Sequence, residues 1–138
     1  MGGGLFSSLI FDSDGSLYGT QGGNVYKLTP PASGQTQWTL TTLYSFPVGA
    51  GAYASLIFDP HGALYGTTRL AGTGYGMVYK LTPPTGHRTQ WTETVVHSFT
   101  FSDGANPYAG VIFDRQGALY GTTYGGGSYA NGTVFKID

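Results

Sequence analysis

The sequence predicts an all-β fold built from tandem repeats of short antiparallel strands, and two observations carry this prediction. First, one segment occurs in three similar copies, which begin at Ser8, Ser55 and Gly110. Second, the apolar residues of each copy come in short runs or alternate with polar ones, and no segment shows the 3.6-residue period of a helix. The copies begin at residues 8, 55 and 110, a spacing typical of four-stranded repeats.

Each copy has the same order of strands and turns. A short apolar strand comes first and ends in a tight turn, where Asp12 accepts backbone N–H bonds and Gly15 adopts the left-handed conformation. Pro30 and Pro31 end the third strand, because proline cannot donate to a sheet. The strands expected in the first copy are Ser8–Asp12, Ser16–Thr20, Asn24–Leu28 and Gln37–Phe46. Those expected in the second are Ser55–Asp59, Ala63–Thr68, Met77–Leu81 and Gln90–Phe99, and in the third Gly110–Asp114, Ala118–Thr123 and Thr133–Ile137.

Four strands in such a span are typical of the blade of a β-propeller. A β-sandwich does not normally repeat its sequence three times, and the repeat of a β-solenoid is much shorter. We therefore expect a single repeat domain over residues 1–138. It would consist of blades at about residues 5–46 and 53–99, followed by a blade at about 108–138 that lacks its outer strand.

Three blades are too few for a ring, since propellers close with about four to eight. Two chains would supply six, so we expect a homodimer that forms one six-bladed ring, with another closed oligomer as the alternative. Residues 1–7 could replace the missing outer strand, but Gly2, Gly3 and Gly4 are poor strand formers.

The composition argues against several classes of function. The formal net charge is −1 and the few lysines are scattered, so we expect no binding to nucleic acid. No run approaches the roughly 18 apolar residues of a membrane helix. The chain has no cysteine and no signal-like start, and nothing in it indicates a cofactor.

The motifs LIFD-x-x-G-x-LYGTT, VYKLTPP and QWTETVVHSF resemble the Gloeo-Verruco (GloVer) tandem repeat of bacterial surface or secreted proteins. The first and second of these motifs also resemble, more distantly, the first three strands of NHL-type propeller blades. The GloVer resemblance covers the chain almost end to end and implies export and a place at the cell surface, but no catalytic residues. The absence of a signal and an anchor favours an excised or engineered segment of a larger protein.

The candidate binding site lies on the loops that follow the second and fourth strands, which we expect to emerge on one face. These loops are rich in glycine and carry tyrosines that could stack on sugar rings, with polar side chains to hold hydroxyl groups. The alternative is that the tyrosines only cover strand ends. The candidate residues are Tyr53, Arg69, Tyr75, Asp103, Asn106, Tyr108, Tyr124, Tyr129 and Asn131.

Catalytic and metal sites are not expected. Asp12, Asp59 and Asp114 recur before each turn, where a ring of carboxylates could hold a cation, but the glycine that follows each favours a turn role. The histidines share no motif, and Glu93 has no acidic neighbour of the glycosidase type. We expect the aromatic residues of the fourth strands to pack between blades; they are Trp38, Phe46, Trp91 and Phe99.

These observations favour a non-catalytic repeat scaffold that assembles with itself. A lectin-like module that binds a glycan or a small polar ligand through the tyrosine-rich loops is the alternative.

Overall fold

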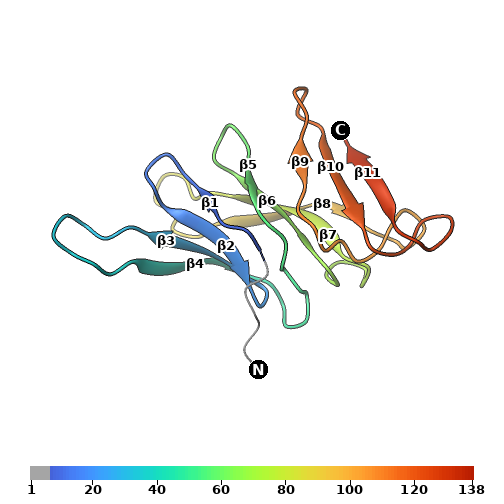
Figure 1. Cartoon of the computed structure of the whole chain (residues 1–138), viewed down its shortest axis with the longest axis horizontal. Coiled ribbons are helices and arrows are strands. Elements are labelled where there is room, and N and C mark those ends of the chain that lie inside the picture. Colours follow the sequence, from blue (N-terminus) through green and yellow to red (C-terminus); the bar gives the residue numbers. More distant parts are fainter. Residues whose placement is uncertain (1–6) are drawn as a thin grey trace.

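The computed structural model describes residues 7–138, and it contains three antiparallel sheets and no helix in that range. Figure 1 shows the sheets side by side in sequence order, with the N-terminal sheet at one end and the C-terminal sheet at the other. The all-β class and the division into three repeats are confirmed. Residues 1–6, which with Ser7 were considered as a poor substitute for the missing outer strand, lie outside the described residues.

Each sheet follows the order of the sequence, so every strand pairs with its neighbour along the chain. The first sheet consists of β1 (Ile10–Phe11), β2 (Leu17–Gln21), β3 (Asn24–Thr29) and β4 (Thr39–Ser45). The second consists of β5 (Ile57–Phe58), β6 (Leu64–Thr68), β7 (Met77–Thr82) and β8 (Thr92–Ser98). The third has only β9 (Ile112–Phe113), β10 (Leu119–Thr123) and β11 (Thr133–Ile137), so β11 has an open edge.

The first strand of each repeat is shorter than the sequence predicts. The expected strand Ser8–Asp12 pairs only through Ile10 and Phe11, opposite Tyr18 and Leu17. The residues before these strands bond to the neighbouring sheet instead: the hydroxyl of Thr20 donates to the carbonyl of Ala54 at 3.1 Å. The lead-ins to the second and third repeats therefore join sheets rather than lengthening a strand.

The core lies between the sheets. Buried side chains of the first and second sheets form one cluster, in which the ring of Phe46 packs on that of Tyr79 with centroids 4.6 Å apart. The second and third sheets share another, in which Phe99 packs on Phe135 at 5.0 Å. Packing of Phe46 and Phe99 between repeats is thus confirmed.

The tryptophans behave differently from one another. Trp91 packs against the cluster between the first two sheets, as expected. The prediction for Trp38 is wrong, because this side chain is 45% exposed. It precedes β4, the outermost strand of the first sheet, which is largely exposed.

Candidate functional site

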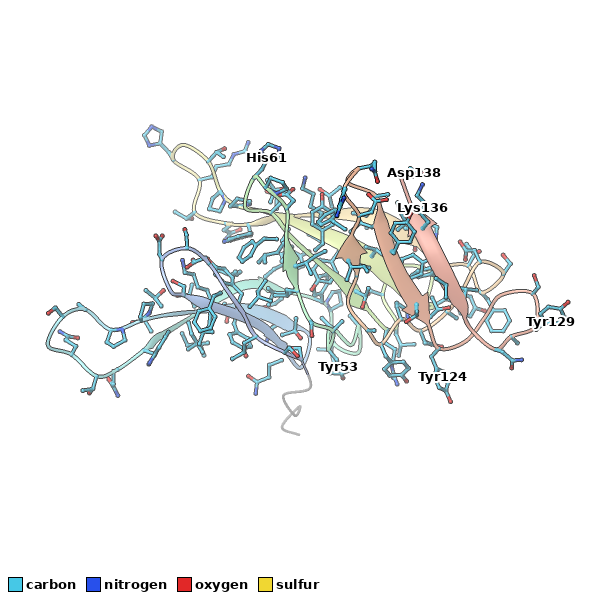
Figure 2. The ribbon with its side chains drawn as sticks, turned by 45° about the horizontal axis from the view of Figure 1, so that its top comes forward. Tyr53, His61, Tyr124, Tyr129, Lys136 and Asp138 are labelled. Carbon is cyan, nitrogen blue, oxygen red and sulfur yellow. The ribbon has the colours of Figure 1, made fainter. Side chains whose placement is uncertain are left out.

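The loops after the second and fourth strands leave the sheets at one end, which we call the loop end. Figure 2 shows Tyr53, Tyr124 and Tyr129 at this end, with His61 and Asp138 on the opposite side. This arrangement follows from the antiparallel order, since alternate connections of a meander lie at opposite ends.

The structure brings three candidate side chains together at the loop end, and we call them the Arg–Tyr cluster: Arg69, Tyr108 and Tyr124. Nη1 of Arg69 donates to the hydroxyl of Tyr108 at 3.2 Å, and the guanidinium carbon Cζ lies over the ring of Tyr108, 5.8 Å from its centroid. The rings of Tyr108 and Tyr124 meet edge to face at 5.6 Å. Both tyrosines are exposed, so the cluster presents aromatic surface beside a cation.

Asn106 holds the loops of this cluster in place. Its amide Nδ2 donates to the carbonyl of Arg69 at 3.2 Å, and its own carbonyl accepts the N–H of Tyr124 at 3.1 Å. Its φ of 55° lies in the left-handed region, which asparagine tolerates better than most residues. The amide nitrogen predicted to contact a ligand is therefore bonded to the backbone.

Tyr53 lies next to the cluster across Gly51. A Cβ atom at Gly51 would stand 3.0 Å from the ring of Tyr53 and 3.1 Å from the Cβ of Arg69. The N–H of Arg69 also donates to the carbonyl of Gly51 at 3.0 Å. Glycine is needed here because φ is 70° and both neighbours are in contact distance.

The remaining candidates are not part of the cluster. Tyr75 packs against Phe101, with ring centroids 5.5 Å apart. Tyr129 and Asn131 are exposed, and they lie in the loop between β10 and β11. The nine residues predicted from the sequence thus divide into separate groups rather than one site.

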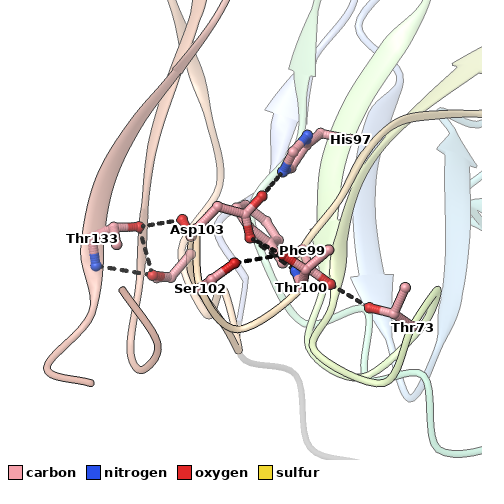
Figure 3. A network of polar contacts seen from close by, with 8 residues as sticks. Thr73, His97, Phe99, Thr100, Ser102, Asp103 and Thr133 are labelled. Atoms are coloured by element: carbon pink, nitrogen blue, oxygen red, sulfur yellow. Dashed lines mark hydrogen bonds and ion pairs between the residues drawn. The ribbon is translucent and has the colours of Figure 1, made fainter. Parts of the chain in front are cut away.

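Asp103 is engaged within its own loop, as Figure 3 shows. Its carboxylate accepts the N–H of Thr100 at 2.8 Å and lies 2.9 Å from Nε2 of His97. Burial alone would raise the pKa of Asp103, but the bonds from Thr100 and His97 outweigh it and hold the pKa below its ordinary value. The backbone carbonyl of Asp103 also accepts a hydrogen bond from the hydroxyl of Thr133 at 3.2 Å, which ties this loop to the third sheet.

The recurring aspartates lie at the opposite end and act in turns, as the sequence predicts. Asp59 accepts the N–H groups of His61 and Ala63, both at 2.9 Å. Asp12 and Asp114 accept the corresponding pairs, those of Asp14 and Ser16 and those of Gln116 and Ala118. Within residues 7–138, no group of three or more His, Cys, Asp or Glu side chains is arranged to hold a metal ion.

In the first two repeats a lysine that was not predicted from the sequence completes the turn, whereas Lys136 of the third repeat pairs with Asp138. Lys27 lies 3.5 Å from the carboxylate of Asp12 and 5.3 Å from the ring centroid of Tyr18, whose hydroxyl donates to Asp12. Lys80 pairs with Asp59 at the same distance and lies over Tyr65. The signal was present, since these three residue types recur at equivalent positions in every copy.

A groove elsewhere on the molecule was also not predicted. It holds about 360 Å³ and runs between β4 and residues 89–91, with Tyr44 and Trp91 in its lining. The side chain of Glu93 lies in an adjoining depression, and its Oε1 is buried with no hydrogen-bond partner among the described residues. These side chains come together only because β4 packs near the segment that leads into β8, so no local sequence pattern could predict the groove.

A search among curated proteins finds no match to the chain. The structure contains no helix in residues 7–138 that is long and apolar enough to cross a membrane. A family model, the Gloeobacter/Verrucomicrobia repeat, matches residues 2–138. Since this match covers nearly the whole sequence, the chain belongs to the Gloeobacter/Verrucomicrobia repeat family.

Proposed function

We propose that the chain is a non-catalytic β-propeller scaffold that assembles with itself, so that two copies close one six-bladed ring. The observation that carries the proposal is the serial packing of three repeat sheets through shared apolar clusters. Each such sheet has the strand order of a propeller blade, and propellers close with about four to eight blades.

The two ends of the chain support this proposal. The third sheet has a free face with Ile112 and Val134 exposed, and the first sheet has a free face with Leu9 and Phe11 exposed. The open edge of β11 adds unpaired backbone groups. Exposed apolar surface at both ends of a repeat array favours association.

The recurring acids support a non-catalytic role. The Asp residues that every repeat shares are bonded to backbone N–H groups in turns, and Asp59 also pairs with a lysine. A carboxylate held in this way stabilises its turn and is not available as a general base.

Molar mass in solution tests the assembly. Light scattering at micromolar concentration should give twice the 14.5 kDa of one chain, and electron microscopy should show a closed ring with six blades. A single-chain mass at every concentration would contradict the proposal.

A second candidate function is binding of a neutral sugar or another small polar ligand at the loop end. The Arg–Tyr cluster favours it, because exposed tyrosine rings and a guanidinium group are suited to stacking and to hydroxyl groups. A glycan array followed by calorimetry tests it. The variant Tyr124→Ala should lose at least tenfold in affinity, whereas Tyr129→Ala, a control in the same loop outside the cluster, should bind like the wild type. Absence of any glycan that binds would dismiss this candidate.

A further inference from the structure

The two joints between sheets inside the chain are built in the same way. At the first, the ring of Tyr18 meets that of Phe58 edge to face at 5.0 Å, and the hydroxyl of Thr20 donates to the carbonyl of Ala54 at 3.1 Å. At the second, Tyr65 meets Phe113 at 5.1 Å. There the hydroxyl of Thr67 donates to the carbonyl of Ala109 at 3.0 Å.

One face of each sheet supplies the tyrosine and the threonine, and we call it the donor face. It also carries an isoleucine and a valine, with the same four residue types in all three repeats. In the first two sheets, the valines of this face are fully buried at the joints. The donor faces consist of Ile10, Tyr18, Thr20 and Val25 in the first sheet, Ile57, Tyr65, Thr67 and Val78 in the second, and Ile112, Tyr120, Thr122 and Val134 in the third.

We call the opposite face of each sheet the acceptor face, because in the second and third sheets it receives the donor face of the preceding sheet. It supplies Phe58 in the second sheet and Phe113 in the third, and a backbone carbonyl from the residues before the first strand. The same positions in the first sheet are occupied by Phe11 and Ser7.

One donor face and one acceptor face have no neighbouring sheet among residues 7–138. On the donor face of the third sheet, Ile112 is 66% and Val134 is 81% exposed, although Val25 and Val78 are fully buried. A depression of about 330 Å³ lies there, lined by residues that include Tyr120 and Thr122. On the acceptor face of the first sheet, Phe11 is 67% exposed.

We propose that the donor face of the third sheet binds the acceptor face of the first sheet of a second copy, which forms a third joint of the same design. In this joint Tyr120 packs against Phe11 of the second copy, and the hydroxyl of Thr122 donates to its Ser7 carbonyl. The inference rests on the proposed self-assembly and specifies its surfaces and their order.

The binding partner is a second copy of the chain for two reasons. The free donor face has the same residue types as the two donor faces that are covered inside the chain, and the free acceptor face of the first sheet is complementary to it. The contact is heterologous, that is, head to tail, and such contacts form rings when the rotation closes. Between the described residues of two copies, the third joint has one contact fewer than the internal ones, since the third sheet has no counterpart of Phe46 and Phe99.

Two variants test the proposal, and each alters a side chain that is exposed in the single chain. Val134→Glu places a charge on the free donor face, and Phe11→Asp places one on the free acceptor face. Each variant alone should have the mass of one chain. An equimolar mixture should recover the mass of two chains, because the intact donor face of Phe11→Asp meets the intact acceptor face of Val134→Glu. This single joint holds the pair, while the other joint, where the two introduced acids would meet, stays open.

A matched control is Val95→Glu, which changes an exposed valine in the middle of β8 and should keep the mass of the wild type. Circular dichroism should show that all variants retain the β-sheet spectrum.

The outcomes separate this inference from the proposed function. If the wild type is a single chain, both are wrong. If the wild type assembles but either variant alone keeps its mass, or the mixture fails to recover the mass of two chains, the head-to-tail joint is wrong and self-assembly stands.

Discussion

At the scale of single residues, the repeat keeps an Asp, a Tyr and a Lys that meet only in the folded sheet. Asp59 shows the energetic balance of this contact. Burial alone raises the pKa of Asp59, but the N–H groups of Ala63 and His61 and the ammonium of Lys80 outweigh it and hold the pKa below its ordinary value. The carboxylate therefore stabilises the folded state in its charged form.

This balance predicts loss of stability in acid. Because the pKa of Asp59 is lower in the folded than in the unfolded chain, its contribution is present above the unfolded pKa of about 3.9 and lost as the pH falls through the folded value. We expect Asp59→Asn to lower the free energy of unfolding by about 1 kcal/mol at pH 7. As the pH falls, the free energy of unfolding of this variant should decrease less than that of the wild type. Urea unfolding from neutral to acidic pH measures both. The control is Asp14→Asn, which alters an exposed carboxylate without a hydrogen bond among the described residues; its free energy of unfolding should match that of the wild type at each pH. If Asp59→Asn shows the same acid dependence as the wild type, the prediction is wrong.

A buried hydroxyl predicts a neutral or stabilising substitution. Tyr79 is fully buried, its hydroxyl has no hydrogen-bond partner among the described residues, and burial raises its pKa. The third repeat has Phe135 at this position. Tyr79→Phe should therefore leave the free energy of unfolding unchanged or raise it by up to about 1 kcal/mol. Tyr18→Phe, which removes a hydroxyl bonded to Asp12 at 3.0 Å, should lower it by about 1 kcal/mol, and equal losses in the two variants would refute this prediction.

At the scale of elements, the inner strands are short and the joints between sheets carry the core. The outer strands β4 and β8 are longer, and each pairs through a register shift, between Val25 and Tyr26 and between Val78 and Tyr79. The residue after each outer strand, Phe46 or Phe99, donates its N–H to a glycine carbonyl and turns its ring into the joint. The phenylalanine at the end of each outer strand therefore packs one repeat against the next.

Phe99→Ala should therefore weaken the joint between the second and third sheets. The side chain is fully buried against His97 and Phe135, and removal of a buried phenylalanine costs about 3–5 kcal/mol. Thermal unfolding followed by circular dichroism measures the loss. Phe101→Ala, which shortens a side chain that is 44% exposed, should cost less than about 1.5 kcal/mol. Similar losses for the two would mean that the joint does not carry the core.

At the scale of the whole molecule, the chain is a linear array whose two end faces are complementary under the proposed joint. Association of folded chains stabilises them by mass action, so Tm should rise with protein concentration. Differential scanning calorimetry over a wide concentration range measures this rise. The variant Val134→Glu should show a Tm that does not depend on concentration, and a wild-type Tm that is equally constant would speak against assembly.

Much of the architecture could be read from the repeat alone. The equivalence of Phe46 and Phe99 predicted their burial, and the Asp–Gly spacing around Asp12 predicted a turn, because both depend on local pattern. The exposure of Trp38 and the shortness of β1 could not be read in this way. Both depend on contacts between sheets: residues before the short first strands bond to a neighbouring sheet, as the carbonyl of Ala54 does with the hydroxyl of Thr20.

The candidate site shows the same division. The loops carrying Arg69, Tyr108 and Tyr124 could be named from the sequence because glycine-rich loops in antiparallel repeats emerge together. Which of the nine side chains meet, and that the amide of Asn106 bonds to the backbone of Arg69, was decided by a fold that brings residues far apart in sequence into contact.

The sequence by itself determined the strand order, the turns and the number of repeats, because each follows from short-range patterns of apolar, proline, glycine and aspartate residues. Only the tertiary structure decided which faces of the sheets are covered, since burial depends on a neighbouring sheet and not on the residues of one strand. The valine of the donor face shows this difference: the same residue type is fully buried at positions 25 and 78, where another sheet packs on it, and 81% exposed at position 134, where no described sheet does.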